Sequence, residues 1–451
     1  MKGFSLAGKG VLSGLVALMA LGVPASARAD PYQPDLPTEK LNEFAEVFSL
    51  IRAAHVSPVD ESRLIEAAIG GMVSSLDPHS TYLNSEALKE FEADQQGSFV
   101  GIGIEAELTG SGFVVIAPMD QSPAARAGIR AGDIVTRVNG VPVSGMSRLQ
   151  AGRSLRGPEN TEVALEVMPA SGADRKTVRL MRQAIHEPSV KARLAEPGFA
   201  LVRIAQFRAS TVAEFTAAMA SLGADATPVK GLVLDLRDNP GGLLASALGV
   251  ASGFLPESAT VLSIRGRLSA QDTVLRADTP SAPSGHPVAP ARLQPWLRTV
   301  PLVVLVNAGS ASAAEVLAAA LQDNRRAVLV GATTFGKGSV QEIIPVGKSS
   351  AVKLTVARYF TPSGRSIQAQ GIRPDLAVPG KGEQSGQPTV READLEHHLP
   401  AEGAEPAVAA SAVERPDAPP ATAFGRDADP QFSAALAYLK QPAGADESAR
   451  R

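Results

Sequence analysis

Buried strands alternate with helices from residue 199 to residue 331, and this alternation restricts the fold more than any other feature of the sequence. Apolar runs such as "KGLVLDLRDN" and "PLVVLVN" have the length and composition of buried strands, whereas "STVAEFTAAMASL" and "SAAEVLAAALQD" have helical spacing. Such alternation predicts a largely parallel sheet with helices packed on it. The strand pair "SVQEIIPV" and "AVKLTVARYF" follows. We therefore expect an α/β core over residues 186–380.

Residues 96–185 differ in character and predict a separate small domain. Short β-rich runs there alternate with turn signals, and three motifs stand out: "FVGIGIE", "SPAARAGIRAGDIVTRVNG" and "LRGPENTEV". The glycines of the first motif precede a strand, where backbone N–H groups converge on an anion. Together the motifs resemble a PDZ domain, which adds a peptide's C-terminal strand to its sheet and binds the free carboxylate. The alternative is a generic β-module with glycine turns.

The N-terminal residues predict export. Lys2 and Lys9 precede an apolar run over residues 11–23, and "PASARAD" then offers small residues for cleavage after Ala27 or Ala29. We expect a signal peptide over residues 1–29 and a periplasmic protein. An uncleaved N-terminus attached to the membrane is the alternative, although the apolar run is short for a span.

Residues 30–95 predict a helical region. Two sets of apolar residues recur at helical spacing and indicate amphipathic helices for packing or dimerisation. They are Leu41, Phe44, Phe48 and Ile51 in the first helix, and Ile65, Ile69, Met72, Val73 and Leu76 in the second.

The C-terminal part predicts a linker and one further helix. Residues 381–425 are rich in Pro, Ala, Glu and Ser, a composition that favours disorder. Within 426–445, Asp429 is placed to cap a helix that has Pro430 in its first turn. Phe432, Leu436 and Leu439 share one face. A partner-binding helix and a helix packed back on the core remain equal alternatives.

Composition excludes several classes of protein. The 451 residues are 44% hydrophobic with a formal charge of −3, as in ordinary soluble domains, and no basic run indicates nucleic-acid binding. The absence of Cys excludes disulfides and a thiol nucleophile, and the six scattered His residues form no metal motif. We expect no metal and no cofactor.

The stretch "GATTFGKGS", residues 331–339, comes close to a phosphate-binding loop. Such a loop needs Ser or Thr directly after its lysine and then a helix, whereas Gly338 follows Lys337 and a strand-like pattern comes next. An exported protein also meets little ATP. Nucleotide binding is therefore disfavoured, and an ordinary surface lysine on a glycine turn is the plain alternative.

The stretch "VNAGSASAAE", residues 306–315, places serines between a buried strand and a helix. Strand ends of open α/β sheets carry catalytic groups, and a helix N-terminus favours an oxyanion. A helix-capping serine is the alternative. No "GxSxG" elbow is present, and His79, His186 and His286 are poorly placed for a triad.

A lysine base remains for such a serine. A lysine amine has an ordinary pKa of about 10.4, and this pKa must fall by about three units for the amine to accept a proton near neutrality. The shift corresponds to roughly 4 kcal/mol, which burial can produce. Lys337 lies among uncharged residues, and Gln341 is placed to orient its amine.

From about Thr38 to Leu376 the chain resembles the C-terminal processing peptidases, or tail-specific proteases. These are serine endopeptidases with a serine–lysine dyad. The resemblance is carried by a series of motifs in order: "SLDPHSTYL", "FVGIGIE", "LRDNPGGLL", "NAGSASAAE", "ALQDNRRA", "TFGKGSVQ" and "TPSGRSIQAQGIRPD".

The resemblance implies an α/β protease core (ClpP/crotonase-like) with an inserted PDZ domain and an N-terminal helical segment. It places the catalytic serine at Ser312, the lysine at Lys337 and a supporting glutamine at Gln341. It implies oxyanion donors at Ala313 and at Gly241 or Gly242, and supportive acidic residues at Glu315 and Asp323. It places substrate binding at Val100, Gly101, Ile102 and Gly103, with Arg156 as a sensor. Asn160 departs from the family's usual "RGPxGT".

These observations predict an exported serine endopeptidase that takes protein or peptide substrates by their free C-termini. A homo-oligomer is expected, and an adaptor protein is a further expected partner. The alternatives are a catalytically silent PDZ scaffold, against which the retention of Ser312, Lys337 and Gln341 argues, and a serine hydrolase for small substrates, which would have no use for a PDZ domain.

Overall fold

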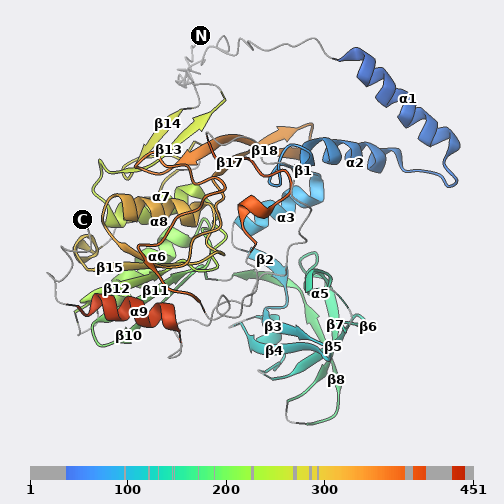
Figure 1. Cartoon of the computed structure of the whole chain (residues 1–451). Helices are drawn as coiled ribbons and strands as arrows, with labels where there is room; N and C mark the ends of the chain where they lie inside the picture. The colour runs from blue at the N-terminus through green and yellow to red at the C-terminus, as the bar shows by residue number, and fades with distance from the viewer. Residues whose placement is uncertain are drawn as a thin grey trace, which may run out of the picture. The chain divides into compact units, whose positions relative to one another are not determined.

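The computed structural model describes residues 37–95, 98–119, 122–130, 132–144, 146, 148–170, 172–186, 188–224, 228–267, 272–283, 287–291, 294–380, 390–402 and 429–441 (Figure 1). The predicted signal peptide, residues 1–29, lies outside them. The chain divides into two compact units, Met1–Ile65 and Glu66–Arg451. Among the described residues, no helix is long and apolar enough to cross a membrane.

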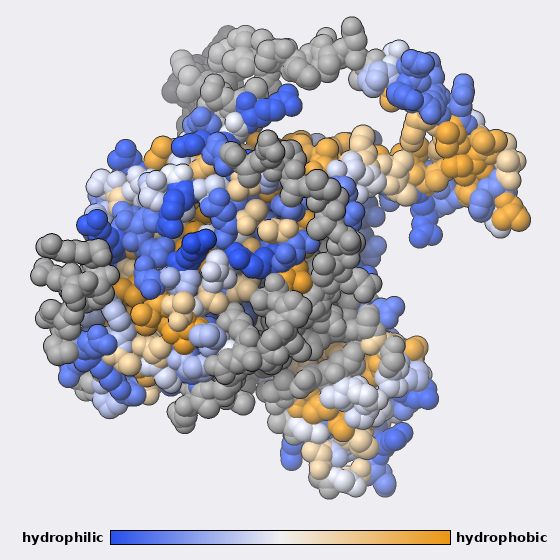
Figure 2. Space-filling view, in the orientation of Figure 1, coloured by the Kyte–Doolittle hydropathy of each residue, from blue (hydrophilic) through white to orange (hydrophobic). Residues whose placement is uncertain are grey.

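The first unit contains helix α1, Thr38–Ala54, and the start of α2, Glu61–Ser74, so the two predicted N-terminal helices are present. No residue of α1 is buried. Its apolar side chains Leu41, Phe44 and Leu50 are exposed, and Figure 2 shows apolar surface toward the C-terminal end of this helix. Within this unit, the described residues therefore leave much of the predicted amphipathic face exposed.

The second unit contains the β-rich domain that the sequence predicts. Strands β3-β4-β5-β7-β8 form its sheet, β6 pairs with β5, and β2 pairs separately with β9. Val135, Val163 and Leu165 are fully buried at its centre, which gives this domain a core of its own. The elements are β2 Ser98–Gly101, β3 Ile104–Thr109, β4 Gly112–Pro118, α4 Pro123–Arg126, β5 Ile134–Val138, β6 Val141–Pro142, α5 Arg148–Leu155, β7 Glu162–Met168, β8 Lys176–Met181 and β9 Gln183–His186.

The central sheet of the α/β core has the strand order β10-β11-β12-β15-β16-β19. All neighbours are parallel except β10 and β11, as the alternation of strands and helices predicts. The strands are β10 Val190–Glu196, β11 Phe199–Ile204, β12 Gly231–Asp235, β15 Leu302–Val306, β16 Val328–Gly331 and β19 Leu376–Ala377.

Both faces of this sheet are covered, which explains why its strands are continuous apolar runs. Leu232 and Leu234 of β12 pack into the large core that includes helices α6, α7 and α8, while Val233 faces the opposite side. Figure 1 shows these helices on one side of the sheet and α9 on the other. The helices are α6 Thr211–Gly223, α7 Leu244–Phe254, α8 Ala313–Asp323 and α9 Pro430–Leu439.

A second sheet has the order β1-β18-β13-β14, with β17 also paired to β18. The predicted strand pair is thus a hairpin of β17 and β18. The segment that follows β13 includes β14 and buries Leu297. Bounds are β1 Thr81–Leu83, α3 Ser85–Gln95, β13 Thr260–Gly266, β14 Thr273–Arg276, η3 Pro295–Arg298, β17 Ser339–Val346 and β18 Ser350–Phe360.

Part of the predicted linker is ordered, so the prediction of disorder over 381–425 is wrong for residues 390–402. This segment includes a short helix, η5 Glu392–Asp394, and the side chain of Glu392 is fully buried. Specific polar partners hold it in place, and composition does not reveal them. The rest of the predicted linker lies outside the described residues.

The C-terminal helix α9 packs back on the core. Asp429 caps it by accepting from the N–H groups of Gln431 and Phe432, as its sequence predicts. Phe432, Leu436 and Leu439 pack against the apolar residues on the outer face of the central sheet. Of the two alternatives left open by the sequence, the structure favours packing on the core.

The buried face of α9 predicts a large effect of truncating Phe432. Phe432→Ala removes a ring that is 7% exposed, and we expect it to lower the free energy of unfolding by about 3 kcal/mol or more. Ala437→Ser, at an exposed position of the same helix, is the control and should change it little. Thermal melts compare the variants, and a wild-type melting temperature for Phe432→Ala would show that the helix does not dock in solution.

Candidate functional site

Three loops of the core meet at one edge of the central sheet. They follow the neighbouring parallel strands β12, β15 and β16, whose carboxyl ends lie at the same edge. In open α/β sheets this edge is where ligands and catalytic groups gather. We name them by residue number: loop 236–242 carries "NPGG", loop 307–312 carries "GSAS", and loop 332–338 carries Lys337.

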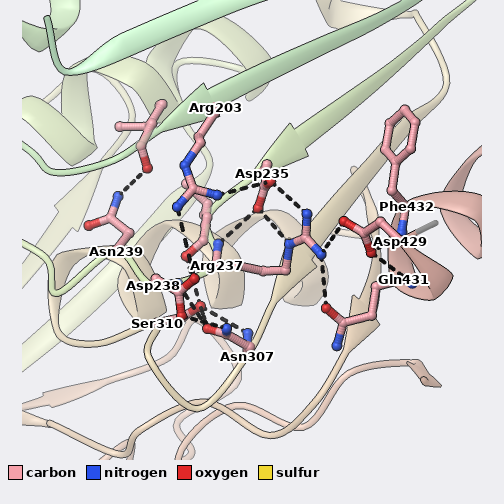
Figure 3. A network of polar contacts seen from close by, with 12 residues as sticks. Arg203, Asp235, Arg237, Asp238, Asn239, Asn307, Ser310, Asp429, Gln431 and Phe432 are labelled. Atoms are coloured by element: carbon pink, nitrogen blue, oxygen red, sulfur yellow. Dashed lines mark hydrogen bonds and ion pairs between the residues drawn. The ribbon is translucent and has the colours of Figure 1, made fainter. Parts of the chain in front are cut away.

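The first two loops are joined by hydrogen bonds. The Asn307 amide accepts from the Asp238 N–H at 2.9 Å and donates to the Asp238 carboxylate at 2.8 Å. The Ala311 N–H donates to the Asn239 carbonyl at 2.9 Å. The buried Ser310 hydroxyl donates to the Leu236 carbonyl at 2.8 Å, so this serine has a structural role (Figure 3). The two loops therefore form one rigid unit.

Ser312 begins helix α8 in a strained conformation. It is half-buried and has φ 53° and ψ −117°, in the positive-φ region that residues other than glycine rarely adopt. Such a conformation costs on the order of 1–3 kcal/mol and persists only where the surroundings enforce it. Its position places the hydroxyl beside the positive end of the helix dipole.

The buried carboxylate of Glu315 joins the serine loop to the lysine loop. One oxygen, Oε2, accepts from the N–H of Ser312 at 2.8 Å and from the N–H of Lys337 at 2.9 Å. The other, Oε1, accepts from the hydroxyl of Thr334 at 2.5 Å and from the N–H of Gly336 at 2.7 Å. A single side chain therefore fixes the backbone of both candidate dyad residues.

Burial raises the pKa of Glu315 to about 7, although the four hydrogen bonds that it accepts act in the opposite direction. The residue has no exposed surface, so removal of the carboxylate from water is the larger effect. The bonds to the serine and lysine loops are charge-assisted when the carboxyl is ionised.

The lysine loop does not have the geometry of a phosphate loop. It ends in strand β17, which begins at Ser339, so no helix N-terminus follows Lys337. Gly336 has φ 98°, and a side chain at Gly338 would lie 2.3 Å from the backbone nitrogen of Gln368. The glycines on either side of Lys337 thus serve a tight backbone path, and Lys337 is half-buried.

Gln341 lies on β17 and is held by its amide nitrogen. Nε2 donates to the Ser339 hydroxyl at 2.9 Å and to the Thr355 hydroxyl at 3.2 Å. Among the bonds between described residues its Oε1 accepts none, which leaves this atom available to an amine. Thr355 in turn donates to Asp77 at 3.0 Å.

Asp77 belongs to the "LDPHSTYL" turn, which follows the second N-terminal helix and is one of the motifs that carry the family resemblance. Its carboxylate accepts from the backbone of His79 and Ser80 and from the Ser80 hydroxyl. Burial acts to raise the pKa of Asp77, but these hydrogen bonds outweigh it and the pKa is lowered. The turn is thereby a rigid support for Thr355 and, through it, for Gln341.

A second contact from the same turn reaches the lysine loop. His79 Nε2 lies 2.7 Å from Glu392 Oε2, and Glu392 Oε1 accepts from the Gln368 amide at 2.9 Å. Gln368 accepts from the N–H of Gly338, the residue after Lys337, at 3.0 Å. His79, considered above for a triad, is therefore bound to a carboxylate that supports this loop. Sequence reasoning missed Gln368 and Glu392 as members of the site.

The oxyanion candidates lie beside Ser312. A side chain at Gly241 would lie 2.8 Å from Ser312 Cβ and 3.0 Å from the Ala313 nitrogen. The N–H of Gly241 already donates to Asn239 Oδ1 at 2.9 Å. Within the described residues, the N–H groups of Gly242 and Ala313 donate to no partner. The bonds from Phe207 to Gly241 and from Leu243 to Phe207 direct the Gly242 N–H to the opposite side of this segment.

The remaining candidate residues lie elsewhere. Asp323, at the far end of α8, accepts from the Ser363 N–H and pairs with Arg365, which indicates a structural role. In the β-rich domain Gly101, Ile102 and Gly103 are buried, and Val100 is half-buried.

Two more residues of the β-rich domain were singled out in the sequence. Arg156 is exposed just after α5. Asn160 has φ 60°, so it keeps the left-handed turn that the family's glycine would adopt. The departure at Asn160 is therefore conformationally conservative.

Comparison with known proteins identifies the class. The profile of "Peptidase family S41" matches residues 198–378, that of "PDZ domain" matches 114–168, and that of "Activating protease CtpB N-terminal domain" matches 23–87. The molecule is thus a mixed α/β protease with a PDZ domain and an N-terminal helical segment, as expected.

A carboxy-terminal-processing protease of Bartonella bacilliformis is 38% identical over 370 residues, 81% of this chain and 80% of that protein. A probable CtpA-like serine protease of Staphylococcus aureus (strain COL) is 36% identical over 75% of this chain and 64% of that protein. The chain belongs to the carboxy-terminal-processing proteases of peptidase family S41, and it is a serine protease.

Two solved structures also match. A photosystem II D1 C-terminal processing protease is 30% identical, with a TM-score of 0.44 over 76% of this chain and 94% of that chain. A putative S41 protease from Bacteroides fragilis is 16% identical, with a TM-score of 0.48 over 78% and 92%. Since both TM-scores are below 0.5, the assignment rests on the sequence relatives.

The raised pKa of Glu315 predicts a pH-dependent effect of Glu315→Gln. A carboxyl whose pKa is raised by folding contributes stability that is fully present below its unfolded pKa of about 4.3 and is lost as pH rises through about 7. The Gln variant lacks this titration. The stability of the wild type relative to the variant should therefore fall by up to about 3 kcal/mol between about pH 4.5 and about pH 8.

Thermal melts of both proteins at these two pH values measure the difference, because all other titrating groups are shared and cancel. A wild type that gains on the variant as pH rises would contradict the assignment.

Proposed function

We propose that this protein is an endopeptidase in which Ser312 is the nucleophile and Lys337 its general base. The observation that carries the proposal is the Glu315 carboxylate, which accepts from the backbone N–H of both residues. Two loops from different strands are thereby held in one arrangement. Reacting groups that are held in the correct orientation lower the activation barrier by several kcal/mol, because their orientation is set before the reaction.

In the proposed mechanism, the neutral amine of Lys337 accepts the proton of the Ser312 hydroxyl as Oγ attacks the scissile carbonyl carbon. The carbonyl oxygen becomes an oxyanion that accepts from the N–H groups of Ala313 and Gly242. Lys337 then gives its proton to the leaving amine, which leaves an acyl group on Ser312. Water, deprotonated by Lys337, hydrolyses that ester. Oε1 of Gln341 is the acceptor that orients the amine.

Gly242 is preferred to Gly241 as the second oxyanion donor. The N–H of Gly241 is already bonded to Asn239, whereas that of Gly242 has no acceptor among the described residues. The segment that presents it is fixed by its bonds with Phe207. A donor whose position is set in advance stabilises charge without reorganisation cost.

We further propose that residues 96–185 form the domain that captures substrates by their C-terminal tails. The buried backbone at Gly101, Ile102 and Gly103 runs from the last residue of β2 to the start of β3. The carbonyls of Ile102 and Gly103 are engaged by Ala124 and Met119, so this turn is fixed. A fixed run of N–H donors suits a terminal carboxylate. Arg156 is retained as a proposed sensor residue.

Export to the periplasm and self-association complete the proposal. Export rests on the sequence of residues 1–29. Self-association rests on α1, whose exposed apolar residues would be buried by a second copy of this chain. An adaptor protein stays a proposed further partner. The rival of a silent scaffold is disfavoured by the strained Ser312, since strain of this kind is retained at functional sites.

Lys337→Arg separates proton transfer from charge. Arginine keeps the positive charge but stays protonated in proteins, so we expect this variant to be as inactive as Lys337→Ala. Ser312→Ala should match both, because members of one catalytic unit are not additive. The measurement is hydrolysis of an unfolded protein substrate, with thermal melts as the folding control. Substantial turnover by Lys337→Arg would exclude Lys337 as the base.

Amidation of a substrate's C-terminus tests tail recognition. Backbone N–H donors bind a charged carboxylate more strongly than a neutral amide. A tail peptide with a C-terminal amide should therefore bind more weakly than the free acid and be cleaved more slowly. Isothermal titration to Ser312→Ala measures binding without cleavage. Equal affinity for acid and amide would remove the carboxylate from the recognition mechanism.

A further inference from the structure

We propose that Arg237, held by Asp429 at the start of helix α9, is a positioning residue for loop 236–242 and its proposed oxyanion donor Gly242, so that the first turn of the C-terminal helix supports the site. The inference rests on the function proposed above. Arg237 belongs to loop 236–242, five residues before Gly242. Asp429 lies 192 positions further along the chain, on an element outside the region that matches the S41 profile.

The guanidinium of Arg237 is the centre of a buried network (Figure 3). Nε and Nη2 each donate to one oxygen of Asp235 at 2.9 Å. Nη1 lies 2.8 Å from Asp429 Oδ2 and donates to Gln431 Oε1 at 3.1 Å. Asp235 ends the core strand β12, whereas Asp429 caps α9 and Gln431 lies in its first turn. The guanidinium therefore joins loop 236–242 and its strand to the helix.

The network is buried, so its charged groups depend on one another for partners. Arg237 is 1% exposed, and Asp235 has no exposed surface. Burial acts to lower the pKa of Arg237, but the hydrogen bonds and charges of Asp235 and Asp429 outweigh it and raise the pKa. A buried charge that loses one partner is strongly unfavourable. Asp429 is therefore the second of two carboxylates that hold the buried guanidinium in this position.

Arg237 is connected to the candidate site through the two residues that follow it. The next residue, Asp238, is bonded to Asn307 of the serine loop, and Asn239 is bonded to Gly241 and Ala311. Asp238 has φ 55°, so the backbone turns sharply between Arg237 and these contacts. A shift of the guanidinium would move this turn and, with it, the Gly242 and Ala313 donors.

Gln431 adds a second link from α9. Its carbonyl oxygen accepts from Arg237, and its Nε2 donates to the Val378 carbonyl at 2.9 Å. Both its ends are thus committed, and its side chain is 2% exposed. Helix α9 consequently fixes Arg237 with one charge and one amide, and neither contact is needed for the apolar packing of the helix.

Asp429→Asn separates the two roles of Asp429. Its Oδ1 caps the helix and its Oδ2 pairs with Arg237. Asparagine caps a helix as well as aspartate does, but its Nδ2 would point a donor at the Arg237 donor. Asp429→Glu, which keeps the charge, is the rescue variant. Leu439→Ala, which loosens the apolar packing of α9 without touching Arg237, is the matched control.

The kinetic test compares kcat, KM and inhibition by a peptide boronate, whose tetrahedral adduct places an oxygen at the oxyanion position. We expect Asp429→Asn to lower kcat about tenfold, to weaken boronate binding in parallel and to leave KM nearly unchanged, since a displaced donor costs less than a deleted one. Asp429→Glu should recover part of the loss. Leu439→Ala should lower the melting temperature and keep wild-type kcat at about 25 °C.

Wild-type kcat and boronate affinity in folded Asp429→Asn would overturn the inference, and so would an equal loss in Leu439→Ala. Hydrogen exchange by mass spectrometry gives a readout that needs no activity. Asp429→Asn should speed exchange in peptides covering 236–242 and 307–312, whereas Leu439→Ala should speed it in α9 alone. If the wild type cleaves no substrate, the proposed function fails and exchange still decides this inference. Should Asp429→Asn not fold, Gln431→Met carries the same comparisons.

Discussion

The arrangement of the candidate site depends on one buried carboxylate. Glu315 is the third residue of helix α8, and it accepts from the backbone of Ser312 on its own helix and from Gly336 and Lys337 on the next loop. The strained conformation of Ser312 and the tight glycine path around Lys337 both need such a restraint, because neither is a conformation that the chain adopts unaided. The central sheet supplies the frame, and Glu315 sets the separation of the two loops.

Segments far apart in the sequence support this centre from outside the region of the peptidase profile. The "LDPHSTYL" turn contacts Thr355 and Glu392, and the segment around Glu392 contacts the lysine loop through Gln368. Helix α9 contacts Arg237 on loop 236–242. The protease core is therefore completed by segments on both sides of the profile region: the turn and the Glu392 segment support the lysine loop, and α9 contacts loop 236–242.

Much of the fold could be predicted because strand and helix periodicity is local. The alternation from residue 199 onward gave the parallel sheet, and the serine and lysine motifs marked the edge where the loops meet. The pairing of His79 with Glu392, 313 residues apart, left no local signal. Composition predicted disorder around Glu392 because it counts residue types and not partners. The apolar face of α9 indicated burial, but the surface that it covers is a property of the folded sheet.

The proposed mechanism requires Glu315 to hold Ser312 and Lys337 in one reactive geometry. The most direct measurement is rapid-quench mass spectrometry of the acyl-enzyme formed from an activated peptide ester, in the wild type and in Glu315→Gln. We expect the acyl group on the peptide containing Ser312, and we expect it to form more slowly by about tenfold or more in the folded variant. Acylation at another residue, or at the wild-type rate in Glu315→Gln, would contradict it.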